Sequence, residues 1–363
     1  MAIATRPASL ASVPHAEAAV YIGRFQPFHN GHLALLQQAL ALAPLCVVVI
    51  GSAYQARTPK NPFTWEERAE MIRLALPASE RERLHFLPMR DYYDEARWID
   101  AVRKGVEAIL VAQGRPAHAA VTLVGHFKDA TSEYLRAFAG WRLASFERVG
   151  AVDGKHLRDA IFSAAGHPLE PTLAALTSQA PASTLDFLRA WHALPFMPVL
   201  AEEWRALKAY RESWASAPYP PVFVTVDTVV RCGDRVLLVQ RGQAPGKGLY
   251  AVPGGFIEQR ETAYQSALRE LKEETRLSLL DVTMRQCLKA AVVFDHPDRS
   301  QRGRTITHAH YFDLGDRELP EVQAGDDAAG ASWVPIEQLR AMEDRFLDDH
   351  FHMLDHFLGL TPR

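Results

Sequence analysis

The sequence predicts two folded domains of different class, an open α/β sheet followed by an α+β domain. The chain has 363 residues, which is long for a single domain. Its first half alternates strand-like apolar runs with helical segments, whereas its second half opens with a hairpin pattern. A proline-rich run, Ala217-Pro-Tyr-Pro-Pro221, separates the two patterns. We therefore expect a flexible leader at 1–17, an α/β domain at 18–165, a helical linker at 166–220 and an α+β domain at 221–363.

The first domain is expected to contain a parallel sheet that binds its ligand at the carboxyl ends of the strands. Two of its apolar runs are followed directly by glycine, at Gly23 and Gly125. Strands that alternate with helices indicate strand–helix–strand units, which bind ligands at that edge of the sheet. The predicted elements are strands at 18–22, 45–50 and 120–124 and helices at 32–42, 64–76 and 97–112.

The second domain is expected to mix strands and helices in a different order. A Cys-Gly-Asp turn that begins at Cys232 joins its first two strands, which is typical of a hairpin. The linker before it has helical composition over 185–214, interrupted by Pro195 and Pro198. The predicted elements are strands at 222–230, 236–240, 286–295 and 305–313 and a helix at 261–275.

Composition excludes several classes of protein. Hydrophobic residues make up 48% of the chain and the formal net charge is −3, so neither disorder nor nucleic-acid binding is favoured. The three cysteines, Cys46, Cys232 and Cys287, suit neither a disulfide framework nor a metal site, and buried thiols are expected for the first two. No signal peptide or membrane helix is predicted, so we expect a cytoplasmic protein, and a homo-oligomer is compatible with the sequence.

A histidine pair marks the first candidate site. The segment from Gly23 to His32 reads GRFQPFHNGH and lies between a predicted strand and helix. His29 and His32 are three residues apart in a first helical turn, where free N–H groups and the helix dipole favour an anion. Gly31 lets the backbone approach a ligand closely. A lone histidine is more often structural, but this pair favours a phosphate site.

This segment resembles the HxGH nucleotidyltransferase superfamily, and its longer string is similar to the archaeal-type nicotinamide mononucleotide (NMN) adenylyltransferases. The likeness extends over 18–165 and implies a Rossmann-like sheet, a nicotinamide pocket at Asp91 and Trp98, and an adenosine-side loop after Gly125. Without the resemblance, Trp98 could equally be a core residue. The resemblance implies these substrate-binding residues: Gly23, Arg24, Phe25, Gly31, Asn61, Arg68, Asp91, Trp98, Gly125, His126, Lys128 and Asp129.

The resemblance also implies the chemistry of the first site. The NMN phosphate would attack the α-phosphorus of ATP, with His29, His32, Arg158 and Mg²⁺ as the catalytic groups. The family motif that ends at this arginine has a serine and a threonine where this chain has Asp153 and Lys155. Asp153 would repel a triphosphate unless Lys155 or the metal compensates.

Three carboxylates mark the second candidate site. Glu270, Glu273 and Glu274 are spaced i, i+3 and i+4 on a predicted helix, so they share one face. Such side chains often simply face water. Brought together, their oxygen atoms suit Mg²⁺ or Mn²⁺ better than zinc.

The string from Gly255 to Leu277 resembles the Nudix box and differs from it at one fixed position, where Arg276 replaces a glycine. The resemblance implies a mixed sheet between helices, with Glu273 and Glu274 as metal ligands. Glu270 would be a ligand or the base that activates water, while Arg269 and Gly255 orient the carboxylates. The implied reaction is hydrolysis of a nucleoside diphosphate joined to another group.

An arginine-rich connection suggests which diphosphate is cleaved. Arg299, Arg302 and Arg304 lie between two predicted strands, either in a solvated loop or in a substrate loop resembling that of ADP-ribose-cleaving Nudix enzymes. The whole chain resembles a bifunctional bacterial arrangement that uses ATP, NMN and ADP-ribose. Alternatives are an ADP-ribose sensor that does not cleave, another diphosphate substrate, or phosphopantetheine as the adenylyl acceptor. A cluster at 348–356 permits a metal between His352 and His356, but a buried closing helix explains it more simply.

Overall fold

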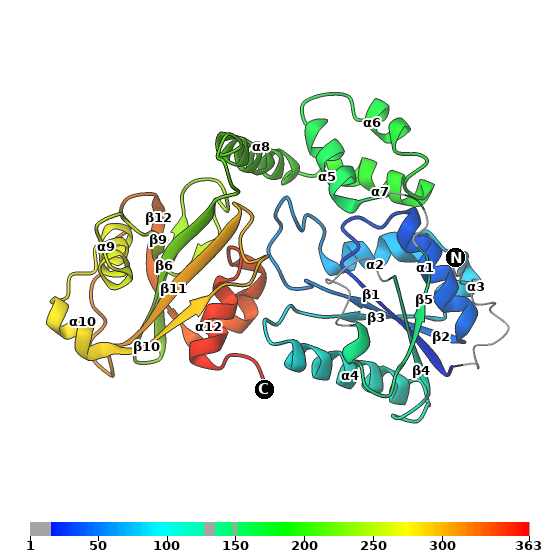
Figure 1. Cartoon of the computed structure of the whole chain (residues 1–363), viewed down its shortest axis with the longest axis horizontal. Helices are drawn as coiled ribbons and strands as arrows, with labels where there is room; N and C mark the ends of the chain where they lie inside the picture. The colour runs from blue at the N-terminus through cyan, green and yellow to red at the C-terminus, as the bar shows by residue number, and fades with distance from the viewer. Residues whose placement is uncertain (1–15, 127–134, 148–149, 151, 363) are drawn as a thin grey trace, which may run out of the picture. The chain divides into compact units, whose positions relative to one another are not determined.

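A computed structural model describes residues 16–126, 135–147, 150 and 152–362 (Figure 1). The chain divides into two compact units. The first contains Phe63–Leu194 and the residues before Tyr54, and the second contains Tyr54–Pro62 and the residues from Pro195 onward. No helix among the described residues is long and apolar enough to cross a membrane.

The first unit contains a five-stranded parallel sheet in the order β3-β2-β1-β4-β5. In register, Val20 of the central strand lies opposite Val47 on one side and Leu123 on the other. The strand order reverses between β1 and β4, and other open α/β sheets bind their ligands at the carboxyl ends of the strands at such a point. The strands are β1 Ala18–Gly23, β2 Leu45–Ile50, β3 Leu84–Pro88, β4 Val121–Gly125 and β5 Arg142–Ser145.

Helices cover both faces of this sheet, with α4 on one side and α1 and α2 on the other (Figure 1). Val102, Val106 and Leu110 recur along α4 at helical spacing and are completely buried against the strands. β2 is buried on both faces, which explains its unbroken apolar run. The helices are α1 Asn30–Leu42, α2 Trp65–Leu74, α3 Ala78–Arg81, α4 Glu95–Ala112, α5 Gly154–Ser163, α6 Glu170–Ala175 and α7 Ala182–His192.

The second unit contains a mixed sheet in the order β10-β11-β6-β7-β12, with β8 paired to β7 and β9 to β6. β11 and β6 are parallel, and the other pairs are antiparallel. The strands are β6 Val222–Cys232, β7 Arg235–Arg241, β8 Tyr250–Ala251, β9 Gly254–Phe256, β10 Leu288–Phe294, β11 Arg304–Asp313 and β12 Ala328–Pro335.

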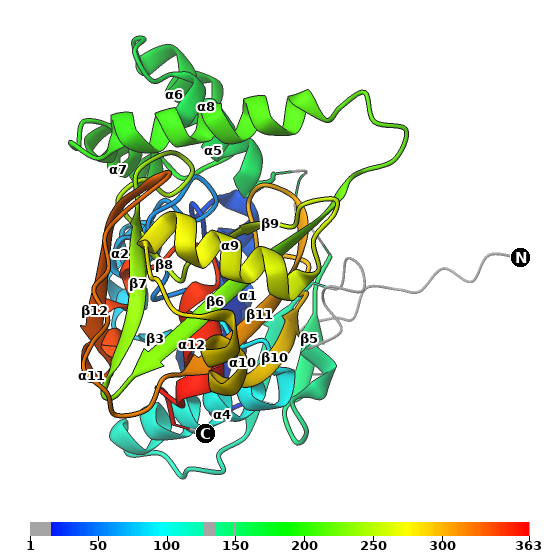
Figure 2. The same ribbon diagram turned by 90° about the vertical axis from the view of Figure 1, so that its left-hand side faces the viewer.

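The two faces of this sheet pack against different helices, α9 on one side and α12 on the other (Figure 2). Successive strand residues point to opposite faces, so Val229 joins the core under α12 while Val230 joins the core under α9. The helices are α8 Met197–Ser213, α9 Ala263–Thr275, α10 Asp281–Cys287, α11 Ile336–Leu339, the 3₁₀ helix η3 Arg340–Arg345 and α12 His350–Leu358. The predicted fold classes of both domains are therefore confirmed.

Each strand and helix predicted for the first domain forms, with bounds shifted by at most three residues. Two strands were missed, because β3 has only five residues and is mostly half-buried and β5 is largely exposed. In the linker, Pro198 does not interrupt a helix but lies in the first turn of α8, where a missing N–H costs nothing. Cys46, Cys232 and Cys287 are all free and buried.

Candidate active sites

The histidine pair follows the carboxyl end of β1, one of the two strands between which the strand order reverses. His29 follows β1 and is the N-cap of α1, where its Nδ1 accepts a 3.4 Å hydrogen bond from the N–H of His32. The two rings stack with centroids 3.6 Å apart. This local bond fixes where α1 begins and aligns both imidazoles along the axis that favours an anion.

Aromatic rings surround His32. The Phe25 ring meets it edge-on at 5.0 Å, and the Phe28 ring stacks on it at 5.8 Å. Burial and the neighbouring His29 lower the pKa of His32 well below its ordinary value, which favours the neutral imidazole. No described residue hydrogen-bonds to its Nδ1. His32 can therefore offer a hydrogen bond to a phosphate, whose charge would favour the protonated ring.

Phe25 is positioned by an unusual backbone. Its φ of 52° lies in the left-handed region. A side chain at Gly23 would meet the Phe25 ring, since a Cβ there would lie 2.8 Å from it. Glycine at this position therefore lets the ring pack against the end of β1.

Arg68, expected among the substrate-binding residues, is completely buried. Its guanidinium donates to the carbonyl oxygens of Arg24 and Gly51 at 2.7 Å each, and to that of Ser52 at 3.1 Å. These carbonyls follow β1 and β2. Arg68 therefore holds the two loops at the carboxyl edge of the sheet, a positioning role that replaces the expected direct contact.

Helix α5 supplies Arg158, whose guanidinium donates to the carbonyl of Gln26, three residues before His29. Burial, and then the nearby Arg24, lower the pKa of Arg158 to about 10, so it stays charged at pH 7. The two arginines lie close enough to repel each other. A triphosphate between them would relieve that repulsion.

The two departures from the family motif have local explanations. Asp153 is the N-cap of α5 and accepts a 2.9 Å hydrogen bond from the N–H of Lys155, a role that serine or aspartate fills equally well. The Lys155 ammonium pairs with Asp159 one turn further along, at 2.7 Å. The first turn of α5 thus accommodates the Asp153 carboxylate.

The other residues expected at the first site divide between several environments. Asp91 accepts hydrogen bonds from the N–H and hydroxyl of Ser52, at 3.2 and 2.6 Å. Trp98 packs partly against the core, with Phe138 edge-on at 5.9 Å, as in the core role considered for it. His126 lies 2.9 Å from the carbonyl of Phe146. Asn61 belongs to the second unit, and Lys128 and Asp129 lie outside the described residues.

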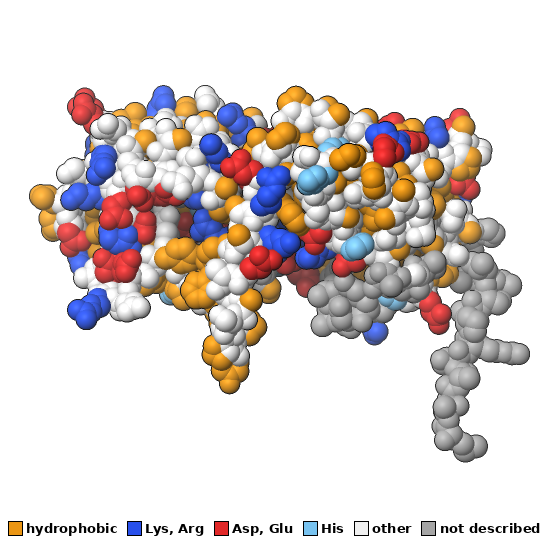
Figure 3. Space-filling model, turned by 90° about the horizontal axis from the view of Figure 1, so that it is seen from above, with side chains coloured by type: hydrophobic (Ala, Val, Ile, Leu, Met, Phe, Trp, Pro, Cys, Tyr) orange, Lys and Arg blue, Asp and Glu red, His pale blue; other side chains and the backbone are white. Residues whose placement is uncertain are grey.

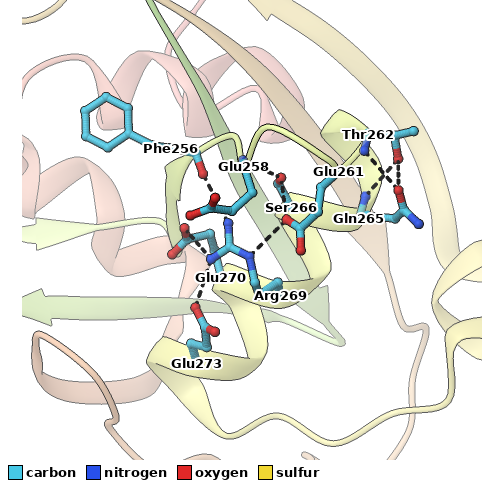
Figure 4. A network of polar contacts seen from close by, with 9 residues as sticks. All are labelled: Phe256, Glu258, Glu261, Thr262, Gln265, Ser266, Arg269, Glu270 and Glu273. Atoms are coloured by element: carbon cyan, nitrogen blue, oxygen red, sulfur yellow. Dashed lines mark hydrogen bonds and ion pairs between the residues drawn. The ribbon is translucent and has the colours of Figure 1, made fainter.

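In the second unit, Arg269 of α9 organises the carboxylates (Figure 4). Its guanidinium contacts Glu261 at 2.9 Å, Glu270 at 2.8 Å and Glu273 at 2.9 Å. It also donates to the carbonyl of Phe256 at 3.1 Å. A planar guanidinium with five donors can serve all four acceptors at once, which a lysine cannot. Arg269 is thus an orienting residue, as the sequence implies.

The glycines before the box shape the other side of the carboxylates. A Cβ at Gly255 would lie 2.5 Å from the carboxylate of Glu270, so only glycine leaves room for that group. The N–H of Gly254 donates to Glu274 at 3.0 Å. Burial raises the pKa of Glu270, and it raises the pKa of Glu274 to about 8. Before a cation binds, Glu274 therefore favours its protonated form near neutral pH.

The donor set suits a divalent cation. As the side chains lie, no three acidic, histidine or cysteine groups of the described residues are arranged around a common point, because Arg269 bridges Glu270 and Glu273. Those two carboxylates and Glu274 nevertheless share one helical face, and buried carboxylates without a metal are costly. Glu270, Glu273 and Glu274 are the residues that would hold the ion.

The three candidate arginines of the substrate loop have different environments. Arg299 is 5% exposed and forms a two-pronged ion pair with Asp349, at 2.8 and 2.9 Å, so it supports the loop from within. Arg304 donates to the carbonyl of Asp295. Arg302 is half-buried, and its guanidinium has no hydrogen-bond or ion-pair partner within the described part of the chain. Of the three, Arg302 is best placed to meet a substrate phosphate.

The histidines at the end of the chain do not form a metal site with their acidic neighbours in the described structure. Asp349 pairs with Arg299, and His350 accepts a 3.1 Å hydrogen bond from the N–H of Val252. The buried closing helix forms as expected, except that Phe346 precedes it.

Two features of this site were missed from sequence. Glu261 also accepts a hydrogen bond from Arg269. It lies in a loop eight residues earlier, and helical periodicity does not predict a contact over that separation. Phe256 lies beside Gly255, and its side chain is 40% exposed. A phenylalanine next to a glycine-rich motif was the available signal.

Comparisons with known proteins agree with both sites. Residues 20–133 match the cytidylyltransferase-like family, and residues 221–357 match the NUDIX domain family. The nicotinamide/nicotinic acid mononucleotide adenylyltransferase of Acinetobacter baylyi is 34% identical over 188 residues, covering 52% of this chain and 93% of that protein. The ADP-ribose pyrophosphatase of Methanocaldococcus jannaschii is 35% identical over 135 residues, covering 37% of this chain and 71% of that protein.

A solved structure matches both units together. It is a bifunctional NMN adenylyltransferase/ADP ribose pyrophosphatase from Francisella tularensis, with a TM-score of 0.85 and 32% identity over 95% of this chain and 99% of that one. The same protein has been solved in complex with AMP and a manganese ion.

Fold and sites together define an enzyme with two active centres, a nucleotidyltransferase joined to a Nudix hydrolase. The Francisella tularensis protein matches nearly the full length of the chain, so the family can be assigned more narrowly than these two enzyme classes. The chain belongs to the family of bifunctional NMN adenylyltransferase/ADP-ribose pyrophosphatases.

Proposed function

We propose that this chain transfers the adenylyl group of ATP to NMN, forming NAD and pyrophosphate, and separately hydrolyses ADP-ribose to AMP and ribose 5-phosphate. The observation that carries the proposal is the full-length match to a bifunctional relative, combined with two complete sets of catalytic side chains. Both reactions break a bond between two phosphates, and they differ in the attacking group.

In adenylyl transfer, a phosphate oxygen of NMN forms a bond to the α-phosphorus of ATP, and the bond to the β-phosphate breaks. The attacking phosphate is already ionised, so the site needs no general base. His29 and His32 would donate hydrogen bonds to the oxygens that gain charge, and Arg158 would hold the leaving pyrophosphate. The neutral His32 described above suits this role, since a bound phosphate favours its protonation.

In hydrolysis, the oxygen of a water molecule forms a bond to one phosphorus of ADP-ribose, and the bridging bond between the phosphates breaks. Glu270 would take the proton of that water, and Arg269 holds its carboxylate in place. Arg302 would bind the diphosphate. A Mg²⁺ or Mn²⁺ ion held by Glu270, Glu273 and Glu274 would neutralise charge on the phosphates.

The alternative of a sensor that binds ADP-ribose without cleaving it receives less support. A sensor has no need of the carboxylates, yet all three are present and joined by one arginine. An adenylyl acceptor other than NMN is likewise less favoured, because Trp98 offers an indole face to a cationic ring.

The proposal is tested by two assays of the full chain with Mg²⁺. One contains ATP with NMN, nicotinate mononucleotide or phosphopantetheine, and the other contains ADP-ribose alone. NAD in the first and AMP with ribose 5-phosphate in the second are expected. Turnover of phosphopantetheine alone would overturn the NMN assignment, and intact ADP-ribose would overturn the hydrolase assignment.

A further inference from the structure

An exposed aromatic ring follows the glycine that adjoins the Glu270 carboxylate. Phe256 follows Gly255, the residue that leaves room for Glu270, and its side chain is 40% exposed. Its carbonyl faces Arg269, while its ring points away from the carboxylates (Figure 4). The hydrogen bond to Arg269 therefore holds the backbone of Phe256 beside the groups that carry out hydrolysis.

The ring belongs to a larger group, which we call the aromatic platform: Tyr210, Trp214, Phe223 and Phe256. Phe223 is its centre, with ring centroids 6.0 Å from Phe256, 5.3 Å from Trp214 and 5.7 Å from Tyr210. Trp214 is 44% exposed. The platform joins β6, β9 and the end of α8, all within the second unit.

The platform lies beside the charged site. The space-filling view shows, in its left-hand part, acidic side chains around a basic one with hydrophobic side chains next to them (Figure 3). Arg302 links the two regions, because its guanidinium carbon lies 5.8 Å from the centre of the Phe256 ring. Gly303 packs against the platform too, since a Cβ there would lie 3.3 Å from the Phe223 ring.

Arg302 and the aromatic platform suit two neighbouring parts of a nucleotide, its diphosphate and its base. Arg302, whose guanidinium makes no hydrogen bond or ion pair within the described residues, suits the diphosphate, and the neighbouring platform suits a flat apolar ring. Exposed aromatic side chains beside a charged site are typical of surfaces that bind a nucleobase by stacking.

We propose that the aromatic platform binds the purine base of the substrate, with Phe256 as the ring on which the base stacks. This inference rests on the proposed hydrolase function and names the part of the substrate that this surface recognises. Phe256 is a binding residue with no part in the chemical step. Its loss should therefore weaken substrate binding and leave kcat nearly unchanged.

The test measures KM and kcat for ADP-ribose with Phe256→Ala, Phe256→Tyr and the control Val282→Ala, a 56% exposed valine on α10. Loss of one stacking contact should raise KM roughly 5- to 150-fold. Phe256→Tyr should restore the wild-type KM, and Val282→Ala should not change it. The base-free analogue, a diphosphate that carries a ribose on each of its two phosphates, should show the same KM with Phe256→Ala as with the wild type.

A second measurement does not depend on hydrolysis. AMP titrated into the full chain should quench tryptophan fluorescence, and Trp214→Phe should remove most of that change. If wild-type protein cleaves ADP-ribose but Phe256→Ala leaves KM unchanged, the platform is not the base site and the proposed function stands. If wild-type protein fails to cleave ADP-ribose, the proposed function fails, and the AMP titration alone decides on the platform. A change of oligomeric state in Phe256→Ala with an unchanged KM would assign the platform to a contact between two copies and overturn the inference.

Discussion

The two active sites bind the same kind of group, a nucleotide phosphate, with side chains of opposite charge. The first site offers His29, His32, Arg24 and Arg158 at the carboxyl edge of a parallel sheet, so the protein itself supplies the donors. The second site offers carboxylates, which repel phosphates until a cation lies between them. Anion binding is thus built into the first fold, whereas the second fold builds a cation site that then binds the anion.

The pKa shifts of the two sites differ in the same way. Burial lowers the pKa of His32 and raises the pKa of Glu274, so both side chains favour their neutral forms before a phosphate or a cation binds. Each becomes charged when its partner arrives, a phosphate for His32 and a divalent cation for Glu274. The two sites should therefore respond to mutation and pH independently and in opposite directions.

The largest expected effect is at Glu270. Glu270→Gln keeps the shape of the side chain but removes the base, so hydrolysis of ADP-ribose should fall about 10²- to 10⁴-fold. NAD synthesis by the same protein sample should be unchanged, which serves as the internal control. A matching loss of NAD synthesis would mean that the two sites do not act separately.

The reciprocal variant is His32→Ala. Loss of a donor to the reacting phosphate should lower kcat for NAD synthesis about 10²- to 10³-fold. ADP-ribose hydrolysis should remain at its wild-type rate. Because His32 packs against Phe25 and Phe28, circular dichroism of the first unit's helices should be recorded as well. Unchanged NAD synthesis would remove His32 from the catalytic groups.

A smaller effect concerns pH and metal. The pKa of Glu274 is about 8 against an ordinary 4.5, so binding of Mn²⁺ near pH 7 should release about one proton. Calorimetry in buffers of different ionisation enthalpy measures this number. Without metal, the protonated Glu274 stabilises the fold below about pH 4.5, and that contribution is lost as pH rises toward 8. Glu274→Gln should abolish the proton release. Proton release that persists in this variant would contradict the assignment.

Asp227, Asp348 and Asp349 are buried carboxyls of the same unit whose pKa values are also raised by burial. Their titration adds to the same fall in stability with pH. The difference in the pH dependence of stability between wild type and Glu274→Gln therefore gives the contribution of Glu274. The pH dependence of the wild type alone contains the contributions of all these carboxyls.

The smallest effect is at Arg276, the one departure from the Nudix box. Its φ of 54° places it in the left-handed C-cap position of α9 that glycine prefers. Arg276→Gly should therefore stabilise the second unit by about 1 kcal/mol and leave both activities unchanged. Thermal unfolding with both assays checks this, and a lower melting temperature would show that the arginine side chain contributes more than its backbone costs.

Local sequence predicted most of the secondary structure, since apolar runs and helical spacing depend on neighbours along the chain. The unbroken run of β2 predicted a strand buried on both faces, and the spacing of α9 predicted carboxylates on one side. The pattern failed where burial is partial, as in β5, and where a segment is very short, as in β9 with its three residues.

Both reaction types could be predicted from the sequence, because each depends on residues close together in the chain: His29 with His32, and Glu270 with Glu273 and Glu274. The roles of the distant residues became clear from the folded structure. It assigned Arg68 to loop carbonyls, Arg299 to a buried ion pair, and Phe256 to an aromatic platform. The physical reason is that burial and pairing depend on segments far apart in sequence. An arginine in a motif therefore identifies a possible contact, and the packing around it determines whether its guanidinium reaches the substrate or the protein.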